Sequence, residues 1–386
     1  MGKVKYAIVG IGKQGSMYAR RFMMNTDKNA VLTAVCDVRE ERRKWAQDAL
    51  KGKVAVYDDY KKMVDDKVAD VIMVVTPHYQ HAEIAEYALS KGLNVLIDKP
   101  AGVYTKAIRE LNEYASEKKG QLFGIMYNQR TNKLYVKAKQ IIESGELGEL
   151  TRIVWIITNW YRPQAYYNQG GWRGTWAGEG GGVLINQCPH QLDLFTWLAG
   201  LPVKVKAYTK TVGRAINVEN DVTAYCEFKN GASGVFITST HDAPGTNRLE
   251  ITGTGGKIII EGRKLTFVKN EVKEPEFSAV NKGFMSKPKN KKIVYKKSLI
   301  EVIRENAFPG QHFRIVRNYS GVLLGKESKL IAPGVDGITG LTFSNAIHLS
   351  GWTGEEVTLP IDEERYIAEL EKRKAEEAVS SAKEVK

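Results

Sequence analysis

The stretch YAIVGIGKQG, residues 6–15, is an apolar run that leads into Gly10, Gly12 and Gly15, spaced G-x-G-x-x-G. Glycines at these positions permit a tight turn and let a pyrophosphate approach the start of a helix. An acid, Asp37, closes the next apolar run about twenty residues further on. Strand, glycine turn, helix and acid together predict a dinucleotide-binding βαβ unit.

The acid at residue 37 also predicts which dinucleotide binds. A carboxylate there accepts hydrogen bonds from both ribose hydroxyls and repels a 2′-phosphate, so we expect NAD in preference to NADP. Arg39 lies two residues on and can soften this preference. The remaining residues of the glycine turn complete the expected cofactor contacts: Ile11, Lys13 and Gln14.

Hydrophobic patterning predicts two α/β domains. Short β-rich runs alternate with amphipathic helical stretches as far as residue 127, which indicates a doubly wound parallel sheet of the Rossmann type. Those runs are 6–12, 31–38, 69–75, 93–98 and 121–127. Longer β-rich runs joined by short Gly or Asn turns follow and predict an open, mostly antiparallel sheet. We expect a Rossmann domain over 1–127 and a substrate-binding and oligomerisation domain over 128–386.

Composition excludes several classes of function. The chain is 43% hydrophobic and 26% charged, and none of its apolar stretches reaches the roughly 18–20 residues of a membrane span. The net charge of +13 is concentrated at 282–297, which holds seven lysines and no acid. Without a nucleic-acid-binding motif beside it, this stretch predicts a solvated loop, and we expect no nucleic-acid or membrane partner. Three scattered cysteines favour the cytoplasm and argue against a disulfide framework.

Polar residues follow two further strands of the predicted parallel sheet. TPHYQH (76–81) comes after the third strand and DKP (98–100) after the fourth. Ligands of open parallel sheets bind at the carboxyl ends of the strands, so we expect Thr76, Pro77 and His81 at the cofactor. By the same argument Lys99 lies where nicotinamide and substrate meet, although spacing alone fits a solvated lysine equally well.

The stretch GEGGGVLINQCPHQLDLF (178–195) places polar residues and a proline where a helix is expected. In one continuous helix, Asn186 and His190 would share a face with Asp193 and Trp197. Histidine suits general acid–base chemistry because its pKa lies near neutrality, but a hydrogen-bonded core histidine is the alternative. No companion ligands accompany Cys188, so we expect no metal.

These motifs resemble the Gfo/Idh/MocA oxidoreductase family, which is named for glucose–fructose oxidoreductase and inositol dehydrogenase. The resemblance spans nearly the whole chain. It includes AIVGIGKQG, the T-P-x-x-x-H of 76–81, DKP in place of the usual E-K-P, GGGVLINQCPHQLDL, and APGVDGITGLTFSNAIHLSGW. It implies a Rossmann domain followed by a domain whose sheet commonly forms dimer or tetramer interfaces, so we expect a homo-oligomer.

The resemblance also implies roles for single residues. Lys99 matches the lysine that binds the reacting hydroxyl beside the nicotinamide, and His190 matches the usual acid/base. Asn186 stands where the family usually has aspartate, and a neutral amide can orient the histidine but adds no charge. We therefore expect a less basic histidine or a larger share of proton handling by Lys99. Trp172 and Arg173 resemble a pair that sugar-oxidising branches place near nicotinamide and substrate.

Further substrate-binding candidates follow from position and composition. Asn128, Gln129 and Arg130 come directly after the last predicted Rossmann strand. A loop rich in aromatic residues suits stacking on sugar rings, although interface packing explains it equally well. Its members are Tyr161, Arg162, Tyr166 and Tyr167.

The sequence thus favours an NAD-dependent dehydrogenase or reductase for a secondary hydroxyl of a sugar, glycoside or cyclic polyol, with glycoside oxidation at ring C3 as one form. An NAD-retaining glycosidase that works by transient oxidation and elimination is a second hypothesis. A non-catalytic dinucleotide sensor is a third. Lys99 and His190 argue against the sensor, which needs neither.

Overall fold

The computed structural model describes residues 2–24, 27–306 and 310–384, and the chain forms two compact units. The first unit comprises Met1–Thr131 with Arg304–Leu341, and the second comprises Asn132–Ile303 with Thr342–Lys386. The sequence predicts a second domain over all of 128–386, whereas the segment Arg304–Leu341 clusters with the first unit. Residues 307–309 and 385–386 of that expected domain lie outside the described residues.

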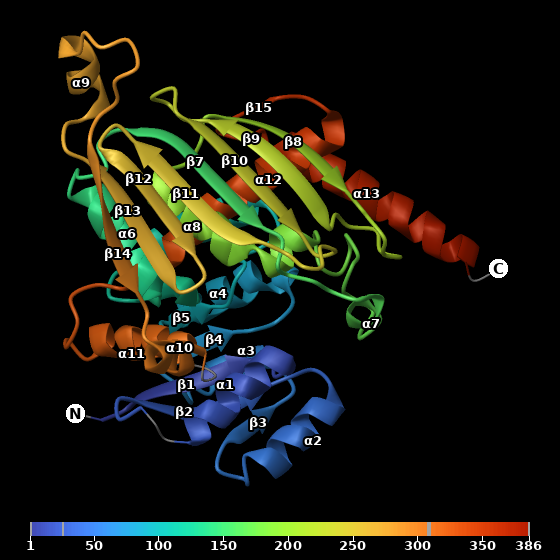
Figure 1. Ribbon diagram of the computed structural model, residues 1–386. Coiled ribbons are helices and arrows are strands. Elements are labelled where there is room, and N and C mark those ends of the chain that lie inside the picture. Colours follow the sequence, from blue (N-terminus) through green and yellow to red (C-terminus); the bar gives the residue numbers. More distant parts are fainter. Residues whose placement is uncertain (1, 25–26, 307–309, 385–386) are drawn as a thin grey trace. The chain divides into compact units, whose positions relative to one another are not determined.

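The first unit is built on a six-stranded parallel sheet with the order β3-β2-β1-β4-β5-β6 (Figure 1). Strand β4 is buried along its whole length, as expected of a parallel strand covered on both faces. The strand order is that of dinucleotide-binding Rossmann domains, which confirms the predicted fold class of this part. The strands are β1 (Val4–Val9), β2 (Ala30–Cys36), β3 (Ala55–Tyr57), β4 (Val71–Val74), β5 (Asn94–Ile97) and β6 (Phe123–Ile125).

One helix of the first unit comes from far along the chain. In this helix, α11, the Tyr319 hydroxyl donates to the carbonyl oxygens of Val95 (3.0 Å) and Leu122 (2.6 Å). Buried tyrosine hydroxyls need such partners, so these bonds hold Arg304–Leu341 on the Rossmann sheet. The helices are α1 (Lys13–Met23), α2 (Glu40–Ala49), α3 (Tyr60–Asp65), α4 (His81–Ser90), α5 (Thr105–Ser116) and α11 (Gly310–Leu323).

The second unit is built on a nine-stranded sheet with the order β14-β13-β12-β11-β7-β10-β9-β8-β15. Only the β7–β10 pair is parallel among the described pairings, so the predicted mostly antiparallel sheet is confirmed. The strands are β7 (Leu150–Ile157), β8 (Lys204–Lys210), β9 (Asp221–Glu227), β10 (Ser233–Ser239), β11 (Asn247–Gly253), β12 (Gly256–Glu261), β13 (Lys264–Asn270), β14 (Asn290–Lys296) and β15 (Val357–Thr358).

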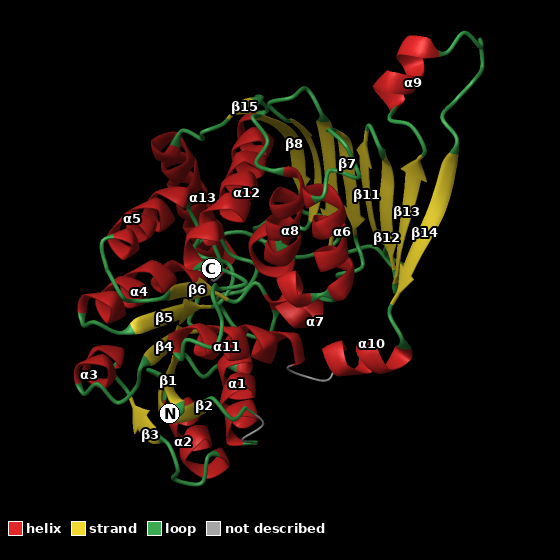
Figure 2. Cartoon of the chain, turned by 90° about the vertical axis from the view of Figure 1, so that its left-hand side faces the viewer, coloured by secondary structure: helices red, strands yellow, loops and turns green. Residues whose placement is uncertain are grey.

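Helices cover one face of this sheet, and α6, α8, α12 and α13 lie along it in Figure 2. The Phe195 ring of α8 stacks on Phe343 of α12 at 5.1 Å and meets Phe236 of β10 edge-on at 5.7 Å. None of the described helices has the length and apolar character needed to span a bilayer. The helices are α6 (Lys133–Glu143), α7 (Gln164–Tyr167), α8 (Pro189–Ala199), α9 (Glu274–Val280), α13 (Glu363–Glu384), and α10 (Leu299–Asn306) and α12 (Gly337–Thr353), which cross the boundary between the units.

The lysine-rich stretch 282–297 is only partly the loop that its composition predicts. Residues 290–296 form β14, which pairs with β13 and is the edge strand of the sheet. Lys291 and Lys292 are exposed there. Exposed lysines on an edge strand discourage pairing with other chains, which gives the charge a structural use.

Candidate functional site

The glycine turn of the first unit requires glycine because its backbone packs closely against neighbouring backbone. A Cβ on Gly15 would lie 1.9 Å from the Gly10 carbonyl oxygen, and one on Gly10 would lie 2.7 Å from that of Val75. Gly10 also has φ +89°, a left-handed conformation that favours glycine. These contacts hold the start of α1 against β1 and leave its first amide groups at the turn, where a pyrophosphate binds in Rossmann domains.

Asp37, directly after β2, lies beside this turn and is 7% exposed. Its Oδ2 accepts the Ile11 N–H (3.0 Å), while Oδ1 accepts the Arg39 N–H (3.0 Å) and lies 3.3 Å from Arg39 Nε. The carboxylate is therefore fixed in direction at the end of β2, the strand whose end positions an adenosine ribose in Rossmann domains. The Arg39 side chain, half exposed, pairs with this carboxylate.

His81 connects the loops after β4 and β5. It is 1% exposed, with Nδ1 2.8 Å from the Pro100 oxygen and Nε2 2.8 Å from the Thr76 oxygen. Burial, reinforced by the nearby Lys99 charge, lowers the pKa of His81, although its backbone hydrogen bonds oppose the shift. The structure therefore buries His81 beneath the loops after β4 and β5, where it holds the two loops together and is not exposed on their surface.

Lys99 follows β5 in a charged and titratable neighbourhood. Its N–H donates to Asp98 Oδ1 (2.8 Å), and burial raises the pKa of Asp98 to about 6 against the opposing charge of Lys99. His312 of α11 is also close: burial and the Lys99 charge lower its pKa to about 4. Tyr18 joins them, with its hydroxyl 3.4 Å from Asp98 Oδ2 and its ring edge-on to His312 at 5.7 Å.

The sequence did not indicate His312 or Tyr18. Tyr18 lies in the first helix without a motif around it, and His312 lies more than two hundred residues from Lys99 in a segment expected in the other domain. Only the docking of α11 on the Rossmann sheet brings this histidine to the lysine.

Two predicted substrate-binding residues are occupied by protein partners. Arg130 is 5% exposed and pairs with Asp336 (2.5 Å), and Asn128 is 3% exposed and donates to Gln311 Oε1 (3.3 Å). Both partners come from the segment Arg304–Leu341. These contacts give Asn128 and Arg130 a part in holding that segment, which does not favour substrate binding by either.

In the second unit, residues 186–197 do not form one continuous helix. Val183–Gln187 form a π-helical turn, closed by the Cys188 N–H to the Val183 oxygen (2.8 Å), and α8 begins only at Pro189. Proline has no N–H to donate and is well suited to a first helical position, so it starts a new helix. Asn186 and His190 therefore belong to two elements, and single π turns are frequent at functional sites.

A buried carboxylate, Glu179, lies next to Asn186 and is not among the site residues predicted from the sequence. Glu179 is 1% exposed; its Oε2 accepts the Gly174 N–H (2.8 Å) and its Oε1 accepts a hydrogen bond from Asn186 Nδ2. Burial raises the pKa of Glu179 to about 7. Asn186 Nδ2 also donates to the Tyr166 hydroxyl (3.2 Å). An acid inside the glycine run GEGGG was the available signal.

Aromatic and arginine side chains gather next to this network. The Arg173 guanidinium lies 5.2 Å from the centre of the Tyr166 ring and 4.7 Å from that of Trp172. Arg162 lies 5.1 Å from the Tyr166 ring on the same measure. Tyr161 is farther out, 47% exposed beneath Arg214. We call Tyr161, Arg162, Tyr166, Trp172 and Arg173 the aromatic–arginine cluster.

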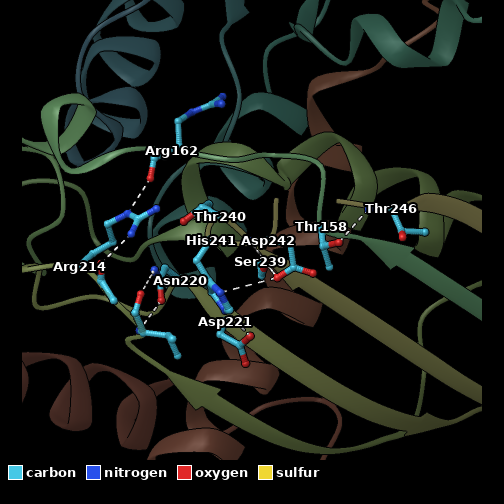
Figure 3. Close-up of polar contacts among 12 residues, drawn as sticks. Thr158, Arg162, Arg214, Asn220, Asp221, Ser239, Thr240, His241, Asp242 and Thr246 are labelled. Atoms are coloured by element: carbon cyan, nitrogen blue, oxygen red, sulfur yellow. Dashed lines mark hydrogen bonds and ion pairs between the residues drawn. The ribbon is translucent and has the colours of Figure 1, made fainter. Parts of the chain in front are cut away.

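The turn after β10 contacts one member of this cluster, Arg162 (Figure 3). The Arg162 N–H donates to the Thr240 oxygen (2.8 Å), and Arg214 Nε donates to the Arg162 oxygen (2.7 Å). Beside them, His241 Nε2 lies 2.8 Å from Asp221 Oδ2. Arg162 is thus attached to the sheet through its backbone groups.

Family models match both parts of the chain. The model described as an oxidoreductase family with an NAD-binding Rossmann fold matches 4–125, and the one described as the GFO/IDH/MocA C-terminal domain matches 135–259. The inositol 2-dehydrogenase of Salmonella typhimurium is 29% identical over 212 residues, which are 53% of this chain. The chain spans only 57% of that relative's length. Myo-inositol 2-dehydrogenase of Thermotoga maritima is 23% identical over 69% of this chain and 77% of its own.

Solved structures share the fold at lower identity. The WlbA dehydrogenase from Chromobacterium violaceum, in complex with NADH and UDP-GlcNAcA, has a TM-score of 0.76 at 23% identity, covering 94% of this chain and 97% of its own. Levoglucosan dehydrogenase in complex with NADH and levoglucosan has a TM-score of 0.73 at 19% identity, covering 93% and 100%.

Proposed function

Because this chain belongs to the GFO/IDH/MocA family of NAD-binding oxidoreductases, we propose that it is an NAD-dependent dehydrogenase or reductase. Its substrate is a secondary hydroxyl, or the matching ketone, of a sugar, glycoside or cyclic polyol. One observation carries the proposal: the glycine turn, Asp37 and Lys99 all follow strands of a single parallel sheet at their carboxyl ends. That edge is where dinucleotides bind in this fold.

The residues present fit NAD. At Gly10 and Gly15 any Cβ would clash with neighbouring backbone, so only glycine permits this turn, and the start of α1 has no acidic residue in its first turn to repel a phosphate. Asp37 suits ribose hydroxyls and disfavours a 2′-phosphate, so we assign NAD rather than NADP. Bound NAD supplies the acceptor for hydride at C4 of its nicotinamide.

The chain's own residues handle charge and protons. Lys99, as an ammonium, stabilises the alkoxide that develops on the substrate oxygen and, in reduction, polarises the carbonyl. His190 takes the hydroxyl proton in oxidation and returns it in reduction. Asn186 orients the groups around that proton. The aromatic–arginine cluster offers faces for a sugar ring, so glycosides, with oxidation at ring C3, come first among the candidate substrates.

The test is a panel of free sugars, aryl glycosides and inositols incubated with NAD and, separately, with NADP. Absorbance of the reduced cofactor and release of the aglycone are read together. Reduced cofactor with one or more polyols or sugars supports the dehydrogenase, and a clear NAD preference supports the role of Asp37. Aglycone release without reduced cofactor supports the NAD-retaining glycosidase, while tight NAD binding without either product supports the sensor.

Self-association is part of the proposal. The face of the nine-stranded sheet opposite the helices carries exposed aromatic side chains, with Tyr208 64% and Tyr225 43% exposed on neighbouring strands. Apolar surface of this kind favours burial against a partner. Light scattering after size-exclusion chromatography reads the mass directly, and a mass of about 43 kDa, that of one chain, would contradict self-association.

A further inference from the structure

The side chain of Asn186 has its orientation imposed by a neighbour. Both hydrogens of its amide nitrogen are engaged, one by Glu179 Oε1 and one by the Tyr166 hydroxyl. An ionised carboxylate can only accept hydrogen bonds, so it requires the NH₂ side of the amide to face it. The carbonyl oxygen Oδ1 is then turned the other way, as an acceptor.

The amide oxygen of Asn186 can accept a hydrogen bond as a carboxylate oxygen of aspartate would at this position. Where family members have aspartate, the resemblance gives that residue the task of orienting the histidine four residues on. Asn186 Oδ1 can accept the same hydrogen bond, but the amide has no charge. The missing negative charge is present on Glu179, which lies in the glycine run seven residues before Asn186 and is 1% exposed.

We propose that Glu179 is a positioning residue that acts through Asn186: it fixes the amide orientation and supplies the negative charge that an aspartate at 186 would carry. This inference rests on the proposed dehydrogenase function. The histidine then need not be less basic than in relatives with aspartate, because Glu179 and Asn186 together provide both the hydrogen-bond acceptor and the negative charge of one aspartate.

The surroundings of Glu179 allow its charge to change near neutral pH. Burial raises the pKa of this carboxyl to about 7, while the Gly174 N–H, the Asn186 amide and the Arg173 charge oppose the shift and the Glu219 charge adds to it. Tyr167 and, through Asn186, Tyr166 are further titratable neighbours of Glu179. A protonated Glu179 can donate, so it no longer dictates which side of the Asn186 amide faces it.

The test compares three variants: Glu179→Gln, Asn186→Asp, and the two combined. Glutamine preserves the shape of residue 179 and removes its charge, so we expect kcat to fall about ten- to hundredfold, as when a hydrogen bond to a charged group is lost, with KM for NAD nearly unchanged. The double variant restores one carboxylate to the pair with donor and acceptor exchanged. It should regain most of the lost kcat, which a purely structural role of Glu179 does not predict.

Two outcomes overturn the proposal: a Glu179→Gln variant with wild-type kcat and pH profile, or a double variant no more active than Glu179→Gln alone. Glu371→Gln, which changes an exposed carboxylate of α13, serves as the matched control and should leave kcat unchanged. Thermal unfolding and NADH binding measured on every variant show whether a loss of kcat comes from misfolding.

A second readout does not require turnover. The chain has six histidines, so a ¹³C-histidine-labelled protein gives few signals, and a His190→Ala variant assigns one of them. Removing the charge of Glu179 should lower the pKa of His190, because a nearby negative charge favours the imidazolium form. If no substrate of the panel is turned over, the proposed function fails, yet an unchanged His190 titration in Glu179→Gln would still refute the positioning role on its own.

Discussion

Replacing Glu219 with glutamine tests what holds the glycine run in front of Asn186. Glu219 is 3% exposed, and its two carboxylate oxygens accept the Gly182 N–H (3.0 and 2.9 Å) and the Leu184 N–H (3.1 Å). His348 Nε2 lies 3.1 Å from Oε2, with its side chain fully buried. One carboxylate thus serves several donors that have no access to water.

The magnitude follows from these contacts. Glutamine keeps the volume but replaces one acceptor oxygen by an NH₂ group, so Gly182, Leu184 and His348 no longer all face an oxygen of a charged carboxylate. An unsatisfied buried donor costs about 1–3 kcal/mol, and breaking a buried charged contact costs about 3–5 kcal/mol. We expect Glu219→Gln to lower the free energy of unfolding by about 3–5 kcal/mol, which is a fall in Tm of about 10 °C for a unit of roughly 200 residues.

Urea unfolding followed by circular dichroism and differential scanning calorimetry measure this change. The m value should stay constant while the midpoint falls, because the surface exposed on unfolding is the same. Glu371→Gln, at an exposed position of α13, should change the free energy of unfolding by less than about 0.5 kcal/mol. A Glu219→Gln protein within about 1 kcal/mol of wild type would refute the argument that this carboxylate holds the glycine run.

Three further predictions concern the first unit. Lys99→Ala should lower kcat by about 10²–10⁴-fold and leave NADH affinity, read by fluorescence titration, nearly unchanged; an unaltered rate would remove Lys99 from the mechanism. Asp37→Ser should reduce the ratio of kcat/KM for NAD over NADP by about tenfold or more, because the ribose acceptor is lost and Arg39 is released from its partner; an unchanged ratio would contradict the assignment of Asp37. Burial raises the pKa of Asp98 to about 6, so the folded protein holds a proton that the unfolded chain has released by then. The stability that this proton contributes is complete below about pH 4 and is lost as the pH rises through about 6. Asparagine cannot ionise, so the free energy of unfolding of Asp98→Asn minus that of wild type, measured in urea, should be about 2–3 kcal/mol larger at pH 7 than at pH 4. Equal differences at the two pH values would rule this out.

Patterns that are local in the chain predicted most of the fold. The alternation of short apolar runs with amphipathic stretches identified the parallel sheet, and the longer runs with tight turns identified the antiparallel one. Patterning failed at Pro189, where the polar and apolar spacing suits one helix and the backbone forms a π turn followed by a new helix. The spacing of polar and apolar side chains does not indicate which carbonyl accepts the hydrogen bond of each turn. It therefore could not reveal where the π turn ends and the new helix begins.

The sequence by itself placed three features: the glycine spacing at 10–15, the acid at 37 and the lysine after the fourth predicted strand. Each lies in its own short strand and turn, so no contact with a distant segment is needed to place it. Contacts between segments far apart in the chain came only with the tertiary structure. His312 reaches the neighbourhood of Lys99 because Tyr319 anchors α11 on the sheet. Glu179 and Asn186 are only seven residues apart, but their contact depends on the glycine-rich loop folding back on the π turn, which side-chain patterning does not predict. Burial and neighbouring charges then shift the pKa values of His312 and Glu179, and both effects arise only when the chain folds.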